Sequence, residues 1–307
     1  MGILAESGKG AILLSEDDLK PICEDHVIKG KRLSNRLRNE VQSEVEQLVK
    51  KYGVPPKLVT VIVGEDEGSQ MYVRMKHKAS NAAGILSEHH GLSENTTQQE
   101  LLELIQKLND DSSVHGILIQ LPLPKHIDEK TIISAIAPLK DVDGFSPANV
   151  YRLFYGSEDL SAATPHGIVT ILDRLGWNDL SGKHAVIINR STIVGKPLIM
   201  LLLNRNATVT VCHSRTKDLS SYTRQADVLV SAIGRRTSVD DPFFISEDMV
   251  KEGAVVIDVA TPFGDVDFEK VKQKAHCITP VPGGVGPMTI AMLLENVLAA
   301  YATQVQQ

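Results

Sequence analysis

Three side chains suited to acid–base chemistry lie close together in the stretch Gly64–Lys78, which reads GEDEGSQMYVRMKHK. Ser69, Tyr72 and Lys76 are spaced by three and four residues. In a helix, which turns by about 100° per residue, they therefore share one face within an arc of about 60°. Arg74 would point to nearly the opposite side. The stretch is therefore a candidate active-site helix, and its central group is a lysine.

A lysine can act as a base only when it is neutral. At its reference pKa, the neutral form at pH 7 costs about 4.6 kcal/mol, so Lys76 would need desolvation or a nearby positive charge. A purely structural interpretation is also open. Ser69 would then be a helix N-cap, Tyr72 a half-buried aromatic residue and Lys76 a side chain that extends its charge into water.

The elements around this stretch alternate between helix and strand. The run Leu58–Val63 is rich in β-branched residues and ends at Gly64, as a buried strand does. A capping-box pattern at Thr97 and Glu100 opens a later helix. The predicted helices are 30–52, 69–83 and 101–108, and the predicted strands are 58–63, 85–92 and 116–120. This order predicts an α/β domain of parallel strands whose active groups lie beyond their carboxyl ends, where Gln120 also lies.

Two turns follow the last of these strands. The sequence 121–124 reads LPLP and cannot continue a central strand, because proline supplies no ladder donor. Further on, the turn 141–144 carries two acids, Asp141 and Asp143, followed by Gly144. An Asx-type turn with solvated carboxylates and a functional site both explain this pattern.

A second domain is predicted to begin at residue 162, where Thr164 is expected to cap a helix with Pro165 at its first position. The predicted strands are 185–189, 208–212, 228–233 and 255–259, and the predicted helices include 196–203 and 247–252. This alternation predicts a Rossmann-like doubly wound parallel sheet. The fold class is therefore α/β, with two α/β domains flanking a cleft.

The turn after the first of these strands has the composition of a phosphate-binding loop. The sequence 189–197 reads NRSTIVGKP and leads into a helix, whose N-terminus offers unpaired N–H groups and partial positive charge. It lacks the G-x-G-x-x-G spacing of the usual dinucleotide motif. The candidate binding residues in it are Arg190, Ser191, Ile193, Val194 and Gly195.

The end of the second strand indicates which nucleotide would bind. A site for NAD usually carries an acid there, but this chain reads His213, Ser214, Arg215 and Thr216. Donors in place of an acid suit the 2′-phosphate of NADP, and Arg190 could supply a second cation. The alternative is a polar loop with a solvated arginine.

Composition narrows the class of protein. The 307 residues suggest two domains of about 150 residues, and a net charge of −6 gives no global attraction to nucleic acid or acidic membranes. The three cysteines lack metal-site spacing and imply neither a disulfide framework nor a zinc site. The first residues do not read as a signal peptide, and no run of 18 apolar residues occurs. A cytoplasmic protein is expected.

Together, these landmarks resemble the bifunctional methylenetetrahydrofolate dehydrogenase and methenyltetrahydrofolate cyclohydrolase family from about Gly30 to Ala300. The stretch 69–76, SQMYVRMK, looks like the catalytic helix of that family. Similar matches are GILIQLPLP at 116–124, the turn 141–144 and the loop 190–197. The glycine- and proline-rich segment 279–289, TPVPGGVGPMT, resembles the second signature of the family.

The resemblance implies NADP-dependent oxidation of 5,10-methylenetetrahydrofolate to the methenyl form, followed by hydrolysis to 10-formyltetrahydrofolate. This is one-carbon metabolism, which supplies purine biosynthesis, in a cytoplasmic homodimer. By resemblance, the catalytic residues are Lys76, Tyr72, Gln120 and Asp143. The residues that would bind folate are Ser69, Tyr72, Asp143, Pro282, Gly283 and Gly286. The folate domain would comprise residues 1–161 and the helix 287–307, and the NADP domain residues 162–286.

Two residues depart from the family pattern, and two other functions compete with the bifunctional enzyme. Asn189 and Ala260 stand where the family commonly has glycine, which affects close contacts with the nucleotide. The alternatives are a dehydrogenase with weak cyclohydrolase activity and a noncatalytic folate- or nucleotide-binding protein. The presence of Lys76, Gln120 and Asp143 argues against both.

Overall fold

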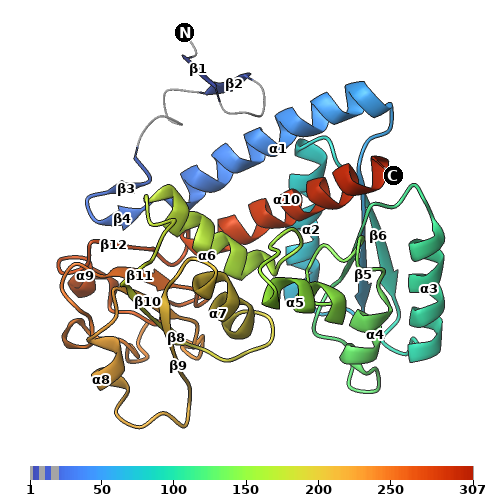
Figure 1. Ribbon diagram of the computed structural model, residues 1–307. Helices are drawn as coiled ribbons and strands as arrows, with labels where there is room; N and C mark the ends of the chain where they lie inside the picture. The colour runs from blue at the N-terminus through green and yellow to red at the C-terminus, as the bar shows by residue number, and fades with distance from the viewer. Residues whose placement is uncertain (1–2, 7–10, 15–20, 307) are drawn as a thin grey trace. The chain divides into compact units, whose positions relative to one another are not determined.

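The computed structural model describes residues 3–6, 11–14 and 21–306 (Figure 1). The chain divides into two compact units. Unit 1 contains Leu13–Arg36 and Ala162–Met292, and unit 2 contains Leu37–Ser161 and Leu293–Gln307, with short N-terminal pieces shared between them. The division between Ser161 and Ala162 coincides with the boundary expected from the sequence. The functional domains assigned from the sequence stay a prediction.

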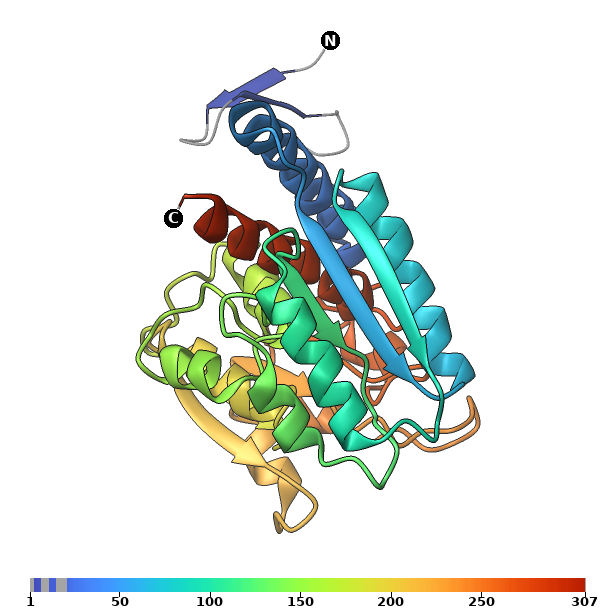
Figure 2. The same ribbon diagram turned by 90° about the vertical axis from the view of Figure 1, so that its right-hand side faces the viewer.

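Unit 2 is built on a three-stranded parallel sheet of order β6-β5-β7 (Figure 2). Its strands are β5 (Lys57–Val63), β6 (Leu86–Leu92) and β7 (Gly116–Ile119). Val59, Val61 and Val63 alternate along β5 onto one face, where they pack with apolar side chains of α3 (Gln98–Asp110) and α4 (Glu129–Ala135). Helix α2 (Glu67–Ala82) contacts β5 and β6. The sheet thereby places the start of α2 and residue 120 at the carboxyl ends of adjacent strands.

Most of the elements predicted in this half are confirmed. Helix α1 spans Gly30–Tyr52, as predicted, and Thr97 forms the expected capping box with Glu100 at the start of α3. The sequence did not indicate α4 or α5 (Pro147–Phe154).

Lys140 has a structural role in unit 2. Its ammonium group is nearly buried and donates hydrogen bonds to the carbonyl oxygens of Leu108, Asn109 and Asp111, at 3.0, 2.7 and 2.7 Å, which are exposed at the end of α3. Burial lowers the pKa of Lys140. These three bonds join the end of α3 to the segment that precedes the turn 141–144.

Replacing Lys140 with methionine is expected to reduce the free energy of unfolding of this unit by about 2–4 kcal/mol, because three carbonyl groups at the end of α3 lose the buried ammonium group that donates to them. Urea denaturation followed by circular dichroism measures the change. The matched control is Lys107→Met on α3, where the lysine is exposed. Equal stability of the two variants would contradict the role of Lys140.

Unit 1 contains a seven-stranded sheet of order β3-β4-β12-β11-β10-β8-β9. The strands are β3 (Cys23–Glu24), β4 (Val27–Ile28), β8 (His184–Ile188), β9 (Thr208–Cys212), β10 (Val228–Ser231), β11 (Val255–Asp258) and β12 (Cys277–Ile278). All pairs are parallel except β3 with β4. The order β9-β8-β10-β11-β12 is the doubly wound order 2-1-3-4-5. The order in which successive strands are added to the sheet therefore reverses between β8 and β10. The predicted fold class is confirmed.

The helices of this unit correct two predictions. Helix α6 spans Ala163–Arg174 with Ala162 at its N-cap, so the expected cap by Thr164 is wrong. Thr164 lies inside the first turn, where its hydroxyl group bonds that of Thr289 at 2.9 Å. The helix expected at 247–252 is only a 3-10 turn at Glu247–Met249, because Val250 already has an extended backbone with φ of −111° and ψ of 137°. The remaining helices are α7 (Gly195–Leu203), α8 (Leu219–Thr223), α9 (Phe268–Val271) and α10 (Val285–Val305).

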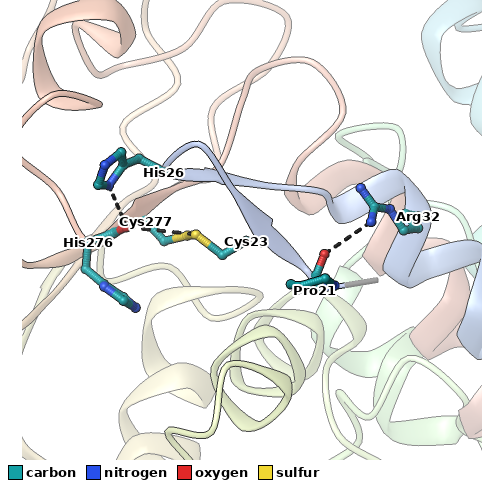
Figure 3. Close-up of a disulfide and its surroundings, with 6 residues drawn as sticks. All are labelled: Pro21, Cys23, His26, Arg32, His276 and Cys277. Atoms are coloured by element: carbon teal, nitrogen blue, oxygen red, sulfur yellow. Dashed lines mark hydrogen bonds between the residues drawn. A yellow bond between two sulfur atoms is a disulfide. The ribbon is translucent and has the colours of Figure 1, made fainter. Parts of the chain in front are cut away.

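A disulfide joins Cys23 in β3 to Cys277 in β12, with 6.3 Å between their α-carbons (Figure 3). The cysteine spacing implied no disulfide framework, and this single bridge was not anticipated. The two residues are 254 positions apart, and only the pairing of the hairpin β3–β4 with β12 brings them together. The His26 imidazole lies within 3.1 Å of the carbonyl oxygen of His276 beside the disulfide.

Helix α10 is mostly apolar. It is long and apolar enough to cross a membrane, but 67% of its most apolar window is buried inside the protein. Burial of this kind is typical of a core helix. At the N-terminus, β1 (Ile3–Glu6) and β2 (Ala11–Leu14) form a separate two-stranded sheet.

Candidate active site

Helix α2 fixes the positions of Ser69, Tyr72 and Lys76. Asp66 is its N-cap and accepts a hydrogen bond from the backbone N–H of Ser69 at 2.7 Å, so Ser69 is not the cap. Ser69 is buried in the first turn, whereas Tyr72 leaves 43% of its surface exposed one turn later. Lys76 follows on the same face and is half-buried. The helix therefore presents an aromatic ring and an amine together.

The ammonium group of Lys76 donates to the side-chain oxygen of Gln120 at 3.0 Å. The amide nitrogen of Gln120 in turn donates to the carbonyl oxygen of Leu121 at 2.8 Å. This second bond fixes the orientation of the amide, so that its oxygen faces the lysine. Gln120 follows β7 and Lys76 lies on the helix after β5, and the parallel pairing of these strands brings the two residues together.

Asp143 is the charged partner of Lys76. Burial raises the pKa of Asp143 to about 6, although the nearby lysine charge opposes the shift. Burial also lowers the pKa of Lys76, and the charge of Asp143 partly offsets this effect. The two groups therefore form an electrostatically coupled pair in which desolvation makes the neutral amine more accessible than it is in water.

Asp141 holds the turn that carries Asp143. Its carboxylate accepts the backbone N–H groups of Gly144 at 3.0 Å and Ser146 at 2.7 Å, and the side-chain amide of Asn149 at 3.0 Å. Gly144 has a φ of 69°, and a Cβ atom there would lie 2.7 Å from the carbonyl oxygen of Leu160. The two acids of the turn therefore differ: Asp141 is structural and Asp143 is the group near the lysine.

Asn296 on α10, in the C-terminal segment of unit 2, supports the same turn, and no sequence pattern indicates this role. Its buried amide donates to the carbonyl oxygens of Val142 and Ser161, both at 2.8 Å. The residues involved lie 154 and 135 positions away in the chain. A local pattern could not reveal this contact.

The predicted dinucleotide loop follows β8, next to the position where the strand order of the sheet reverses. Its backbone N–H groups are largely used within the loop. The side-chain oxygen of Asn189 accepts from Ser191 at 2.7 Å and Gly195 at 3.2 Å, and the hydroxyl oxygen of Ser191 accepts from Val194 at 3.1 Å. A Cβ atom at Gly195 would lie 2.4 Å from the carbonyl oxygen of Asn189, so only glycine fits there. Arg190 and Ile193 are exposed at this edge of the sheet.

The end of β9 carries the second part of the predicted nucleotide site. The hydroxyl oxygen of Thr216 accepts from the backbone N–H of His213 at 2.9 Å, and the His213 ring accepts from that of Arg215 at 3.2 Å. Ser214 and Arg215 are exposed at the tip of this turn. The stretch from 213 to 216 contains no acid and carries Arg215, so the donor set fits a nucleotide that carries a phosphate on its ribose.

The segment predicted to contact folate from the second signature lies in unit 1. The carbonyl oxygen of Gly283 accepts from the backbone N–H of Lys31 at 3.0 Å, and Gly284 touches Gly30 so closely that a Cβ atom on Gly30 would lie 2.0 Å from its oxygen. Pro282 and Gly286 flank these residues. Gly30 thus allows α1 to begin directly against this segment.

Two family models match the chain. Residues 28–143 match the tetrahydrofolate dehydrogenase/cyclohydrolase catalytic domain, and residues 162–305 match the NAD(P)-binding domain of the same family. The chain is 54% identical over 281 residues to the bifunctional protein FolD of Moorella thermoacetica, which covers 89% of this chain and 98% of the relative.

Solved structures agree with these matches. The bifunctional FolD enzyme of Campylobacter jejuni aligns with a TM-score of 0.84 and 48% identity, over 90% of this chain and 98% of that one. The methylenetetrahydrofolate dehydrogenase-cyclohydrolase of Trypanosoma brucei, solved in complex with NADP and an inhibitor, aligns with a TM-score of 0.85 and 37% identity. That alignment covers 92% of this chain and 98% of the trypanosomal chain.

Proposed function

Because the chain belongs to the tetrahydrofolate dehydrogenase/cyclohydrolase family, we propose that Lys76, Gln120 and Asp143 form the cyclohydrolase centre of a bifunctional one-carbon enzyme. The protein oxidises 5,10-methylenetetrahydrofolate with NADP to the 5,10-methenyl form and hydrolyses that product to 10-formyltetrahydrofolate. The observation that carries the residue assignment is the hydrogen bond from Lys76 to Gln120, together with the charge interaction between Lys76 and the half-buried Asp143.

Hydrolysis requires a water molecule to attack the cationic carbon that bridges N5 and N10 of the methenyl substrate. A new C–O bond forms and the water gives up one proton. The bond from carbon to N5 then breaks as the remaining hydroxyl becomes the formyl carbonyl, and its proton passes to N5. The amine of Lys76 is the group that takes the first of these protons. The positive charge of the substrate and the burial of Lys76 both favour the neutral amine. Gln120 holds the amine in place through its side-chain oxygen.

Folate recognition is assigned to groups around the same lysine. An ionised Asp143 can accept the two N–H groups that the amino-pyrimidinone edge of the pterin presents, and Tyr72 can pack its exposed ring against the folate. Ser69, which is buried in the first turn of the same helix, is assigned to the same ligand on the family resemblance. Pro282, Gly283 and Gly286 supply a rigid backbone segment for the same ligand, an assignment that rests on the family signature.

The dehydrogenase step takes place at the nucleotide site of the second domain, residues 162–286. The nicotinamide of a bound NADP would supply the hydride acceptor for oxidation of the methylene carbon. The chain contributes position rather than proton transfer to this step. Arg190, Ser191, Ile193, Val194 and Gly195 form one wall of this site, and the turn of His213, Ser214, Arg215 and Thr216 binds the 2′-phosphate.

Replacing Arg215 with alanine is expected to raise the Kd for NADP about tenfold and to change the Kd for NAD by less than twofold, because only NADP carries the phosphate that Arg215 contacts. Fluorescence titration of each cofactor measures the change. The matched control is Lys217→Ala, which removes an equal charge two residues away. An unchanged ratio of the two Kd values in the Arg215 variant would mean that other residues read the phosphate.

A cytoplasmic homodimer completes the proposal, with 10-formyltetrahydrofolate supplying purine biosynthesis. The family resemblance supports these assignments, together with a net charge of −6, which does not favour association with nucleic acid or anionic membranes. Size-exclusion chromatography with light scattering tests the oligomeric state.

A coupled absorbance assay tests the function as a whole. The protein is mixed with methylenetetrahydrofolate and each nicotinamide cofactor in turn, and the methenyl species is followed as it forms and decays. Formation that requires NADP, followed by enzyme-dependent decay, is the expected result. Formation without faster decay would instead favour a dehydrogenase with weak cyclohydrolase activity, and no turnover would favour a noncatalytic binding protein.

A further inference from the structure

The segment 231–234, which follows β10, is held on one side by a buried acid. The carboxylate of Asp265 is fully buried and accepts hydrogen bonds from the hydroxyl group of Ser231 at 2.8 Å, the N–H of Ile233 at 2.7 Å and the N–H of Gly234 at 3.0 Å. Its partners are therefore three neutral donors from one short stretch of chain. The acid fixes the direction in which the backbone leaves the strand.

Asn189 holds the same segment from the other side. Its side-chain amide donates to the carbonyl oxygen of Ala232 at 2.7 Å, while its side-chain oxygen accepts from the N–H groups of Ser191 and Gly195. One side chain thus links the loop after β8 to the segment after β10. Between them, Asn189 and Asp265 bond to each of the residues 231 to 234.

The loop that contains Asp265 is itself positioned by a second carboxylate. Asp258, at the end of β11, accepts the N–H of Ala260 at 3.0 Å and that of Val266 at 3.0 Å, one on each side of the loop that carries Asp265. A Cβ atom at Gly264 would lie 2.8 Å from the Asp258 carboxylate. The ends of β8, β10 and β11 are therefore joined by one continuous set of hydrogen bonds.

The location of this network indicates a role beyond folding. In doubly wound sheets, ligands bind outside the carboxyl ends of the strands where the strand order reverses, which here is between β8 and β10. The bond from Asn189 to Ala232 spans this position. A buried carboxylate is costly to desolvate, and among the residues that the structure describes no cation pairs with Asp265.

We propose that Asp265 and Asn189 are positioning residues for the dinucleotide: together they fix the segment 231–234 in the conformation that receives NADP. This inference rests on the proposed function, because it assumes that NADP binds at this edge of the sheet. It assigns the two side chains no direct part in hydride transfer. Their loss should therefore weaken cofactor binding and lower dehydrogenase activity relative to cyclohydrolase activity.

Isosteric and truncating substitutions in the full-length protein test this role. In Asp265→Asn an amide N–H₂ group faces backbone donors, and the Kd for NADP is expected to rise about tenfold or more. Asn189→Ala removes the link to Ala232 and is expected to raise this Kd about fivefold. In both variants the ratio of dehydrogenase to cyclohydrolase activity, measured at a fixed low concentration of NADP, should fall in proportion.

The matched control for these variants is Asp227→Asn, at the amino end of β10. Asp227 accepts the N–H of His184 at 2.9 Å and pairs with Lys251 at 2.7 Å, so its replacement also costs hydrogen bonds, but at the end of β10 away from the proposed site. It is expected to lower the melting temperature while the Kd for NADP stays within about twofold of wild type.

The outcomes separate the inference from the function on which it rests. A wild-type protein that bound no NADP would overturn both. Normal NADP binding by wild type together with unchanged Kd values in Asp265→Asn and Asn189→Ala would overturn the inference alone. If Asp265→Asn does not fold, Asn189→Ala decides the question. An equal rise of the Kd in the Asp227 control would also overturn the inference, because the effect would then follow from general loss of stability.

Discussion

Replacement of Lys76 with methionine is expected to reduce the rate of methenyl hydrolysis by about 10³-fold. Methionine keeps an unbranched apolar chain but cannot take a proton from water, and it leaves the side-chain oxygen of Gln120 without its donor. The rate is measured as the decay of methenyl absorbance in the absence of nicotinamide cofactor. NADP affinity, measured on the same preparation, reports whether the second domain is folded.

Lys78→Met is the matched control for this variant. Lys78 lies on the same helix, two residues further on, and is exposed. Its replacement removes an equal charge and should leave hydrolysis within about twofold of wild type. Near-normal hydrolysis by the Lys76 variant would remove the lysine from the mechanism and leave water orientation to other groups.

Replacement of Asp143 with asparagine is expected to raise the KM for folate substrates about 10- to 100-fold, because an amide N–H₂ group would face the N–H groups of the pterin where a carboxylate accepted them. The control is Asp110→Asn, an exposed acid at the end of α3. Steady-state kinetics at several pH values measure the effect. An unchanged KM would place pterin recognition elsewhere.

The pH dependence of the KM for folate substrates follows from the ionisation state of Asp143. Its pKa is raised to about 6, so the ionised form is present above pH 6 and is lost as the pH falls through that value. The folate KM of the wild type should therefore rise as the pH falls through about 6, and this titration should be absent from Asp143→Asn. A titration that persisted in the variant would have to come from another group.

Local sequence patterns predicted the part of this site that depends on neighbouring strands. Lys76 and Gln120 follow β5 and β7, and because parallel strands end at one edge of a sheet, their proximity could be expected before the structure was known. The capping box at Thr97 could likewise be predicted, since its two residues, Thr97 and Glu100, lie within one helical turn. Periodicity and caps are local signals, and these features need nothing more.

The supports of the site could not be predicted in this way. Asn296 reaches Val142 across 154 residues, and Asp265 reaches Ser231 across 34, so the tertiary fold alone makes these contacts. Thr164 is of a residue type that often caps helices. Its hydroxyl group instead bonds that of Thr289, which is distant in the sequence. The strands β3, β4 and β12 have two residues each, too few for any alternation of apolar and polar positions.

The short hairpin β3–β4 also protects an edge of the larger sheet. Val27 pairs with Ile278, so β4 covers the backbone groups of β12, and the disulfide from Cys23 keeps it there. A recombinant chain shortened to begin at Gly30 would leave the apolar pair Cys277 and Ile278 as an open strand edge with a free thiol. Such an edge can recruit strands from other molecules, so shortened protein should aggregate and form intermolecular crosslinks on storage.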